Sequence, residues 1–543
     1  MAYLLPFLLA MVVTMLLLPA LSRAATKWRF VDAPSERKVH SAPIPRVGGA
    51  AMAVGVLVAS LCVVPLEPQD RYFLLAAGVV VLFGGLDDRF DLDYRVKLAG
   101  QVLAAAIVVF GARIQIHELT LDDRVLVPQW VSVPLTFFFL IGITNAINLA
   151  DGLDGLAGGT TFLSLCALAM LAYGGGEPAA ALLALTFAGA VLGFLRFNTY
   201  PASVFMGDAG SQLLGFAVGV ISLRATQGGE GVVSTAAPIL LLALPILDTL
   251  SVMVQRIGEG RSPFSADKNH IHHKLLTLGF HHHEAVVVIY AVQADLFLLA
   301  YWMRYESDLA ILGVVTALFA GAIFLLQTAV RRGFRFRAPR ETRQPSRLVR
   351  VAGDLLAPRH LPRWTYLAVA IALLVYAGLI VVETARLSGD VKLLLFTLLA
   401  MTMLWLSILR IRPLILIERG ALYVTVAILV YLDTLVTHDP VWSMVNWGVI
   451  LTAAAGTVLR LRLSRDRRFE LTPLDLIVLF VALVLPSLPG SISLPHGGAL
   501  GIAKLVILFY AAEVLVSRTE MPVVWVRIGV ATVLTGLIVR PFL

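Results

Sequence analysis

Long apolar runs, each closed by a short polar stretch, follow one another along most of the chain. One run, residues 73–86 with the sequence FLLAAGVVVLFGGL, ends directly at the acidic sequence DDRFDLD. A membrane-spanning helix needs about 20 mostly apolar residues, and only helices or closed barrels satisfy their backbone groups in lipid. The runs are continuous and lack the short alternating segments of barrel strands. The pattern therefore predicts an all-α polytopic membrane protein.

The apolar runs form two sets with a basic segment between them. The first set predicts a bundle of about 10–11 transmembrane helices, near 3–22, 47–66, 71–86, 96–113, 131–149, 155–173, 178–196, 209–224, 233–255, 285–303 and 308–328. Residues 331–363 follow, with ten arginines and two acidic residues. The second set predicts an extension of about 5–7 helices, near 364–385, 391–410, 414–436, 441–460, 473–488, 497–517 and 522–540.

Composition supports the membrane prediction. Hydrophobic residues make up 59% of the 543 residues and charged residues 14%, whereas a soluble domain carries about 25% charged residues. The net charge is +8, but most Lys and Arg lie in loops between the runs, which argues against a nucleic-acid partner. Both cysteines, Cys62 and Cys166, fall inside apolar runs, so we expect neither a disulfide framework nor a Cys-based metal site.

The distribution of basic residues predicts an orientation. Arg23, Lys27 and Arg29 follow the first apolar run, which favours a first span with its N-terminus outside and its basic end in the cytoplasm. The loops after the first, third, fifth, seventh, ninth and eleventh spans then face the cytoplasm. These loops hold most of the Lys and Arg, and they include the Arg-rich segment 331–363, which we expect to be a cytoplasmic linker.

Polar motifs recur on this same face. They are VDAPSERKVHSAPIPRVGG (31–49), FGGLDDRFDLDYRVKLAGQ (83–101), NAINLADGLDGLAGG (145–159), RFNTYPASVFMGDAGSQLLG (196–215) and RIGEGRSPFSADKNHIHHKL (256–275). Five loops thus bring carboxylates, amides, histidines and basic groups to one side of the membrane, which predicts an active site at the membrane surface.

The residue types indicate phosphoryl transfer. Converging carboxylates repel one another unless a hard cation lies between them, and Mg²⁺ prefers oxygen ligands together with water and substrate phosphates. Lys, Arg and His neutralise phosphate oxygens, and catalysis of phosphoryl transfer is mostly positioning and charge stabilisation. Each motif taken alone also has a structural interpretation. DDRFDLD can be a solvated loop, Asp208 can be only a helix cap, and the histidines can form an exposed turn.

The four motifs from residue 83 onward resemble those of the polyprenyl-phosphate N-acetylhexosamine-1-phosphate transferases, most closely the WecA/TagO branch, with the MraY translocases more distant. The resemblance covers about residues 1–330. It implies a catalytic membrane domain over 1–330, a linker over 331–363 and a C-terminal transmembrane region of unknown role over 364–543. We find no family motif in that last region, where Glu383, Asp433 and Glu513 are charges within predicted spans.

The reaction implied by the resemblance joins a UDP-N-acetylhexosamine, expected to be UDP-GlcNAc, to undecaprenyl or another polyprenyl phosphate. It releases UMP, uses Mg²⁺ or Mn²⁺, and begins the synthesis of a cell-envelope polysaccharide. The expected location is the bacterial inner membrane, with the site on the cytoplasmic face, and the expected assembly is a homodimer. An MraY-type transfer of phospho-MurNAc-pentapeptide and a membrane transporter are the alternatives; a catalytically inactive scaffold disagrees with the intact motifs.

Residue roles follow from the same resemblance. Asp87, Asp88 and Asp208 are the expected catalytic residues, one of the first two handling the lipid phosphate, with Asp208 and Asp88 as metal ligands. The expected substrate-binding residues are Lys97, Asn148, Asp151, Asp154, Asn198, Arg261, His270, His272 and His273.

Overall fold

The computed structural model describes most of the N-terminal part of the chain and several helices of the C-terminal part. The described residues are 3–28, 30–32, 43–121, 123–228, 233–262, 270–334, 361–383, 399, 422, 425–426, 428–434, 440–463, 498–517 and 523–539. Among them, nine helices are long and apolar enough to cross a membrane. The only strands in these ranges form two short hairpins. The prediction of an all-α polytopic membrane protein is confirmed.

The chain divides into two compact units, which are described separately. The N-terminal unit runs from Ala2 to Pro339, and the C-terminal unit takes up most of the chain from Arg340 onward. Most of the predicted linker, residues 335–360, lies outside the described residues.

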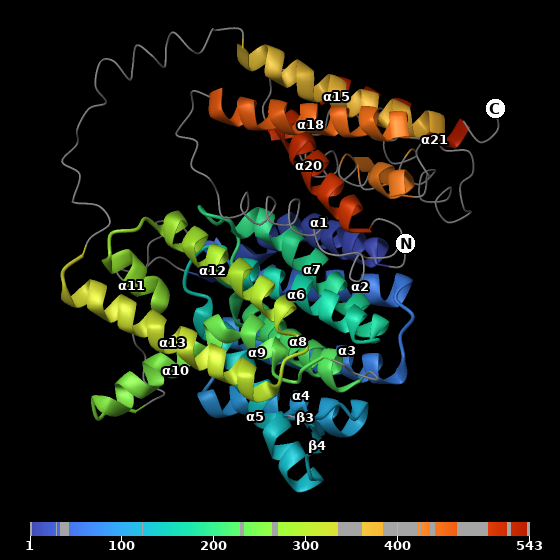
Figure 1. Ribbon diagram of the computed structural model, residues 1–543. Helices are drawn as coiled ribbons and strands as arrows, with labels where there is room; N and C mark the ends of the chain where they lie inside the picture. Colours follow the sequence, from blue (N-terminus) through green and yellow to red (C-terminus); the bar gives the residue numbers. More distant parts are fainter. Residues whose placement is uncertain are drawn as a thin grey trace. The chain divides into compact units, whose positions relative to one another are not determined.

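The N-terminal unit consists of helices that run back and forth (Figure 1). They are α1 (Leu4–Trp28), α2 (Gly48–Val63), α3 (Pro68–Phe90), α4 (Tyr94–Ala106) with its π-helical end η1 (Ile107–Ala112), α5 (Gln129–Ala150), α6 (Leu156–Gly174), α7 (Pro178–Asn198), α8 (Gly207–Gln227), α9 (Ala237–Leu241), α10 (Ala243–Gly258), α11 (Ile271–Thr277), α12 (His282–Trp302) and α13 (Asp308–Arg331). The hairpins pair β1 (Val31–Asp32) with β2 (Ile44–Pro45), and β3 (Glu118–Thr120) with β4 (Arg124–Leu126).

Helices α6, α7 and α8 form the centre of this unit, and their side chains are buried nearly all the way round. Helix α8 packs against α3 and α5 through small residues. A side chain at Gly84 would meet the backbone of Ala209, and one at Gly215 would meet the backbone of Thr144. Small residues let helix backbones approach closely in membranes, so these glycines bring the ends of α3, α5 and α8 together.

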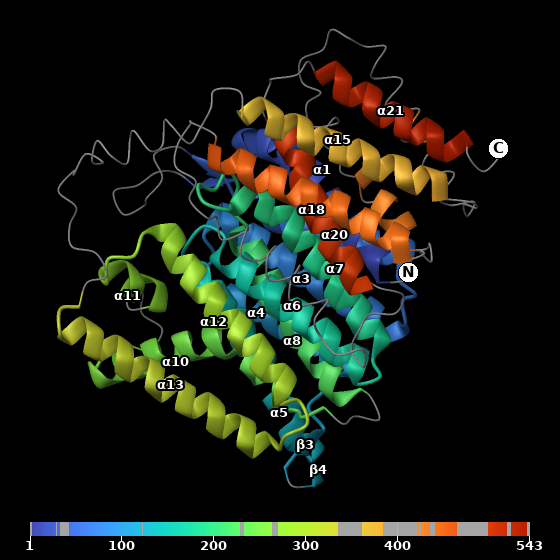
Figure 2. The same cartoon turned by 45° about the horizontal axis from the view of Figure 1, so that its top comes forward.

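The predicted span 233–255 is two helices. Helix α9 ends at Leu241 and α10 starts at Ala243. Pro245 explains the break, because its ring clashes with the carbonyl of the residue four positions earlier and it has no N–H to donate. Helices α10, α11, α12 and α13 lie together on one side of the bundle in both views (Figure 2).

The end of the bundle away from the polar motifs is fixed by its own buried ion pairs. Arg224, near the end of α8, pairs with Asp70 at the start of α3 and lies 3.3 Å from Glu177 beside α7. Both Asp70 and Arg224 are buried. Burying unpaired charges costs several kcal/mol, so this pairing ties together the ends of three helices.

The C-terminal unit contains α15 (Leu361–Glu383), α18 (Pro440–Leu463), α20 (Gly498–Ser517) and α21 (Val523–Val539) among its described residues. Asp433 is buried in this unit and lies 2.5 Å from Lys504 of α20. It also accepts hydrogen bonds from Tyr376 at 3.2 Å and from Asn446 at 2.6 Å. Glu383 is the last residue of α15, and the side chain of Glu513 lies outside the described residues.

Candidate active site

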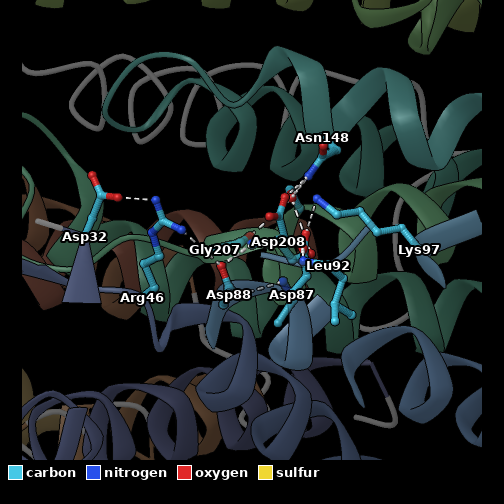
Figure 3. Close-up of polar contacts among 11 residues, drawn as sticks. Asp32, Arg46, Asp87, Asp88, Leu92, Lys97, Asn148, Gly207 and Asp208 are labelled. Carbon is cyan, nitrogen blue, oxygen red and sulfur yellow. Dashed lines mark hydrogen bonds and ion pairs between the residues drawn. The ribbon is translucent and has the colours of Figure 1, made fainter. Parts of the chain in front are cut away.

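The polar motifs meet at one end of the N-terminal unit because its helices alternate in direction. Helices α3, α5 and α7 end there, and α4, α6 and α8 begin there. Figure 3 shows the resulting cluster, in which Asp87, Asp88, Lys97, Asn148 and Asp208 lie close together. Separate loops thus bring these predicted residues to one place.

Asp88 caps the helix that carries Asp208. Its carboxylate oxygens accept the backbone N–H groups of Asp208 at 2.9 Å and of Ala209 at 3.1 Å. The residue before them, Gly207, has φ +69° and lies against the Asp88 carboxylate, so a side chain there would overlap it. Burial raises the pKa of Asp88 to about 7, although the two amide hydrogen bonds act in the opposite direction. Both carboxylate oxygens of Asp88 therefore accept hydrogen bonds from the start of α8.

Asp87 points to the other side of the α3 terminus. One of its oxygens lies 2.5 Å from Lys97 Nζ on α4, and the other accepts the N–H of Leu92 at 2.8 Å. The carboxyl of Asp208 lies near that of Asp87 (Figure 3). Burial, and then this second carboxyl, raise the pKa of Asp87. Like charges held together in a dry site repel, which is the condition that a bound cation relieves.

The remaining acids of DDRFDLD are part of the turn. Asp91 has φ 50° and ends α3, and the Asp93 carboxylate accepts the N–H of Arg95 at 2.8 Å to cap α4. The acidic run thus contains two site residues and two turn residues.

Asn148, at the end of α5, holds Asp208 from the opposite side. Its amide donates to Asp208 Oδ1 at 2.6 Å and to Ser211 Oγ at 2.7 Å. One α-helical turn earlier, Asn145 donates to Gln101 at 2.7 Å, and Gln101 donates to Gln212 at 3.2 Å. These amides fix α4, α5 and α8 relative to one another, so the Asp208 carboxylate has a defined position.

No group of three or more His, Cys, Asp or Glu side chains arranged to hold a metal is found within the described ranges. Mg²⁺ does not require such a cage, since it commonly takes one or two carboxylates together with waters and substrate phosphates. The neighbouring carboxylates of Asp87 and Asp208 supply oxygen donors of this kind (Figure 3). The donor set therefore fits a hard divalent cation.

Two of the expected substrate-binding residues hold loops together. Asp154 accepts the N–H of Ala202 at 2.9 Å, and its own N–H donates to His282 at 3.0 Å. Asn198 accepts the N–H of Gly155 at 3.0 Å and donates to the carbonyl of Val204 at 3.0 Å. Both residues thereby join the loop after α5 to the loop after α7. By contrast, Asp151 in the first of these loops is exposed.

The histidine motif lies beside the loop that follows α5. His272 is buried, and its ring covers Gly152, where a side chain would overlap it. Burial, reinforced by neighbouring His273, lowers the pKa of His272 to about 4, so that this ring is neutral at physiological pH. Its centroid lies 5.7 Å from that of His270 and 4.3 Å from that of His273.

The same motif contains Arg261, the other residue predicted to bind substrate. Arg261 is exposed and pairs with Glu259. Asp267 and Lys268 lie outside the described residues.

Two further polar residues at this end of the bundle were not singled out from the sequence. Arg46 pairs with Asp32, and its guanidinium lies 3.9 Å from Asp88. Asp248, buried in α10, lies 2.8 Å from His270. Arg46 lies in the first polar motif, within the sequence PIPRVGG. A search of that motif for basic residues could have identified Arg46 as a candidate. Asp248 was hidden because it occurs inside an apolar run.

The region that carries most of these motifs is similar to a known protein family. Residues 71–226, from α3 through α8, match the sequence model of glycosyl transferase family 4. The chain is 37% identical over 290 residues to a probable undecaprenyl-phosphate N-acetylglucosaminyl 1-phosphate transferase of Bacillus subtilis (strain 168), covering 53% of this chain and 80% of the relative.

Two other relatives match over a similar region. A decaprenyl-phosphate N-acetylglucosaminephosphotransferase of Mycolicibacterium smegmatis is 37% identical over 297 residues, 49% of this chain and 73% of its own length. An undecaprenyl-phosphate alpha-N-acetylglucosaminyl 1-phosphate transferase of Escherichia coli (strain K12) is 31% identical over 326 residues, 58% of this chain and 87% of its own length.

Proposed function

The chain belongs to glycosyl transferase family 4, and on this premise we propose that it transfers N-acetylglucosamine-1-phosphate to a polyprenyl phosphate. The observation that carries the proposal is the ion pair between Asp87 and Lys97 beside the Asp208 carboxylate, inside the matched region (Figure 3). It combines carboxylate oxygens with a basic group, as phosphoryl transfer requires. The relatives are named as N-acetylglucosamine transferases, which favours this activity over an MraY-type transfer or a transporter.

The donor in this proposal is UDP-GlcNAc. An oxygen of the lipid phosphate attacks the β-phosphorus of the donor, the bond from that phosphorus to the bridging oxygen breaks, and UMP leaves. The product is a polyprenyl-diphosphate-sugar. The bond between the sugar and its phosphate stays intact in this reaction. The protein therefore needs only to hold two phosphate groups in line and to neutralise their charge.

Asp208 and Asp87 are the residues we propose to hold a Mg²⁺ ion. Both oxygens of Asp88 accept amides of α8, so we assign Asp88 to positioning Asp208, in place of the metal-ligand role expected from the resemblance. When bound, Mg²⁺ would neutralise phosphate oxygens and the charge on the departing UMP.

The basic and amide groups of this chain complete the proposed site. Lys97, held 2.5 Å from Asp87, is placed to neutralise a phosphate beside the two aspartates. Arg46 approaches Asp88 from the opposite side and can contact a phosphate through its paired N–H groups. Asn148 holds the Asp208 carboxylate in place by donating to its Oδ1 atom.

We also propose that the site faces the cytoplasm and the N-terminus lies outside, in a bacterial inner membrane. The basis is the excess of Lys and Arg in the loops on the motif side. Single cysteines at Gly174 and Glu259, in a background without Cys62, should react with impermeant reagents from opposite sides of the membrane. Labelling of both from one side would contradict this orientation. The expected homodimer stays a prediction.

The function itself is tested with the purified full-length protein, undecaprenyl phosphate and a panel of UDP-sugars. We expect UMP release and a lipid-linked product with UDP-GlcNAc, with loss of both after chelation of divalent cations. Turnover of UDP-MurNAc-pentapeptide in preference to UDP-GlcNAc would favour the MraY-type alternative.

A further inference from the structure

Asp248 connects helix α10 to the histidine motif at two points. Its Oδ2 atom lies 2.8 Å from Nδ1 of His270, and its Oδ1 atom accepts the backbone N–H of Ile271 at 2.7 Å. The side chains of Asp248 and His270 are each only 9% exposed. One carboxylate therefore contacts both the ring of His270 and the first residue of α11.

The position of Asp248 in the sequence makes this contact notable. It lies in the apolar stretch LPILDTLSV of α10, a helix that packs against α5. A carboxylate in apolar surroundings is costly unless it is hydrogen-bonded. Here both oxygens have their partners in a single short segment, His270–Ile271, so the carboxylate is used to hold that segment.

The contact determines which nitrogen of His270 carries a proton. An ionised carboxylate can only accept, so Nδ1 must carry the hydrogen and Nε2 is left for another partner. When the ring is doubly protonated, the negative charge of Asp248 balances it and Nε2–H is a donor suited to a phosphate oxygen. Carboxylates that orient a functional histidine in this way are common in enzyme sites.

The contact also fixes where the histidine motif lies. The ring of His270 is nearly parallel to that of His272, with an angle of 4° between them. The ring of His272 in turn covers Gly152. Through Ile271 and these stacked rings, Asp248 holds the start of α11 against the loop that carries Asp151 and Asp154.

We propose that Asp248 is a positioning residue of the transferase: it accepts Nδ1–H of His270 and balances the charge of the doubly protonated ring, so that Nε2–H donates to a phosphate of the nucleotide-sugar. This proposal rests on the proposed function. The alternative is that Asp248 merely tethers α11, in which case the protonation of the His270 ring does not affect turnover.

Asp248→Asn separates these two roles. The amide oxygen can still accept the N–H of Ile271, while the amide nitrogen donates to His270 Nδ1. The tether is kept, but an amide that donates to Nδ1 cannot balance a doubly protonated ring, so the ring stays neutral and its charge is lost to the phosphate. We expect kcat to fall about 100-fold, within the range found when the group that orients a functional histidine is changed, with the KM for UDP-GlcNAc within about threefold of the parent.

Asp308→Asn is the matched control. Asp308 is also a buried carboxylate, and it accepts backbone N–H groups of Thr120 at 2.6 Å and Ala236 at 2.9 Å. It lies at the start of α13, at the end of the bundle away from the site. This variant should lose thermal stability to a similar degree while keeping the parental kcat.

A double variant provides the second kinetic readout. His270→Gln alone should lower kcat, and adding Asp248→Asn should lower it no further, because Asp248 acts through His270. A tether that acts on α11 as a whole would instead produce additive losses. Additive losses, or a kcat of Asp248→Asn within about threefold of the parent, would overturn the proposal.

The protonation state is measured on the parent protein by ¹⁵N NMR of labelled histidine, with His270 assigned from the signal lost in His270→Gln. At a pH where the ring is neutral, we expect the proton on Nδ1. A proton on Nε2 would overturn the proposal even if Asp248→Asn failed to fold. If the parent protein made no lipid-linked product, the proposed function would fail, while this spectrum would still report on the contact of Asp248 with His270.

Discussion

The carboxylate of Asp88 spans the first backbone amides of the helix that carries Asp208, accepting the N–H of Asp208 itself at 2.9 Å. A residue of one motif thus sets the position of a residue in another motif, 120 positions further along the chain. The paired aspartates of DDRFDLD consequently have different tasks. Asp87 pairs with Lys97 beside Asp208, whereas Asp88 serves as the cap of α8 (Figure 3).

Asp88→Asn should therefore impair stability and activity together. An amide side chain can accept only one of the two N–H groups, and its own N–H group would face the other. Loss of a helix cap costs about 0.5–2 kcal/mol, so we expect a lower melting temperature in detergent and reduced turnover. Binding of UDP-GlcNAc, measured by calorimetry, should survive. Full activity with unchanged stability would contradict the capping role.

Lys97→Met separates the basic group from the metal requirement. Removal of the ammonium leaves Asp87 and Asp208 with more uncompensated negative charge, which should bind a cation at least as tightly. We expect kcat to fall by at least about tenfold because a phosphate loses its neutralising partner. The Mg²⁺ concentration that gives half-maximal activity should stay equal or decrease. An increase in that concentration would show that Lys97 supports the metal site indirectly.

Gly207→Ala should disrupt the contact between Asp88 and α8. A side chain at this position would overlap the Asp88 carboxylate, and the backbone φ of +69° is itself strained for alanine. We expect turnover to fall and the melting temperature to decrease. Gly85→Ala in α3 is the control, since a methyl group there meets nothing within 4 Å. Equal effects of the two substitutions would argue against a specific contact.

A chain that ends at Ala338 should keep transferase activity. The division between the two compact units falls next to this residue, between Pro339 and Arg340. Every residue that we place in the site lies in the N-terminal unit. The comparison is of turnover by the shortened and full-length proteins in the same lipid. A shortened protein that folds but is inactive would show that the C-terminal unit contributes to catalysis.

Much of the site was predictable because its residues lie in polar sequences at the ends of apolar runs. The regular alternation of helix direction then places Asp87, Asn148 and Asp208 at one end of the bundle. The individual partners were not predictable from that pattern. Asp88 and Asp208 are both acidic residues at helix ends, and only the geometry shows that the first caps the helix of the second.

Buried charges were the other feature that the sequence concealed. Asp248 and Arg224 look like interruptions of apolar runs, and their roles depend on partners far along the chain. The break between α9 and α10 was similarly missed, although Pro245 supplies its cause. Hydropathy finds the spans, but it does not identify which polar residue within a span has a partner.

We propose that Asp208 binds the catalytic cation in the transfer of N-acetylglucosamine-1-phosphate to a polyprenyl phosphate. The most direct measurement is formation of polyprenyl-diphosphate-GlcNAc by purified Asp208→Asn protein across a range of Mg²⁺ concentrations, beside the parent. The substitution keeps size and the ability to cap a helix but removes the charge that a hard cation requires. We predict a folded protein with essentially no product at any Mg²⁺ concentration, whereas substantial product from Asp208→Asn would show that the Asp208 carboxylate is not the required cation ligand.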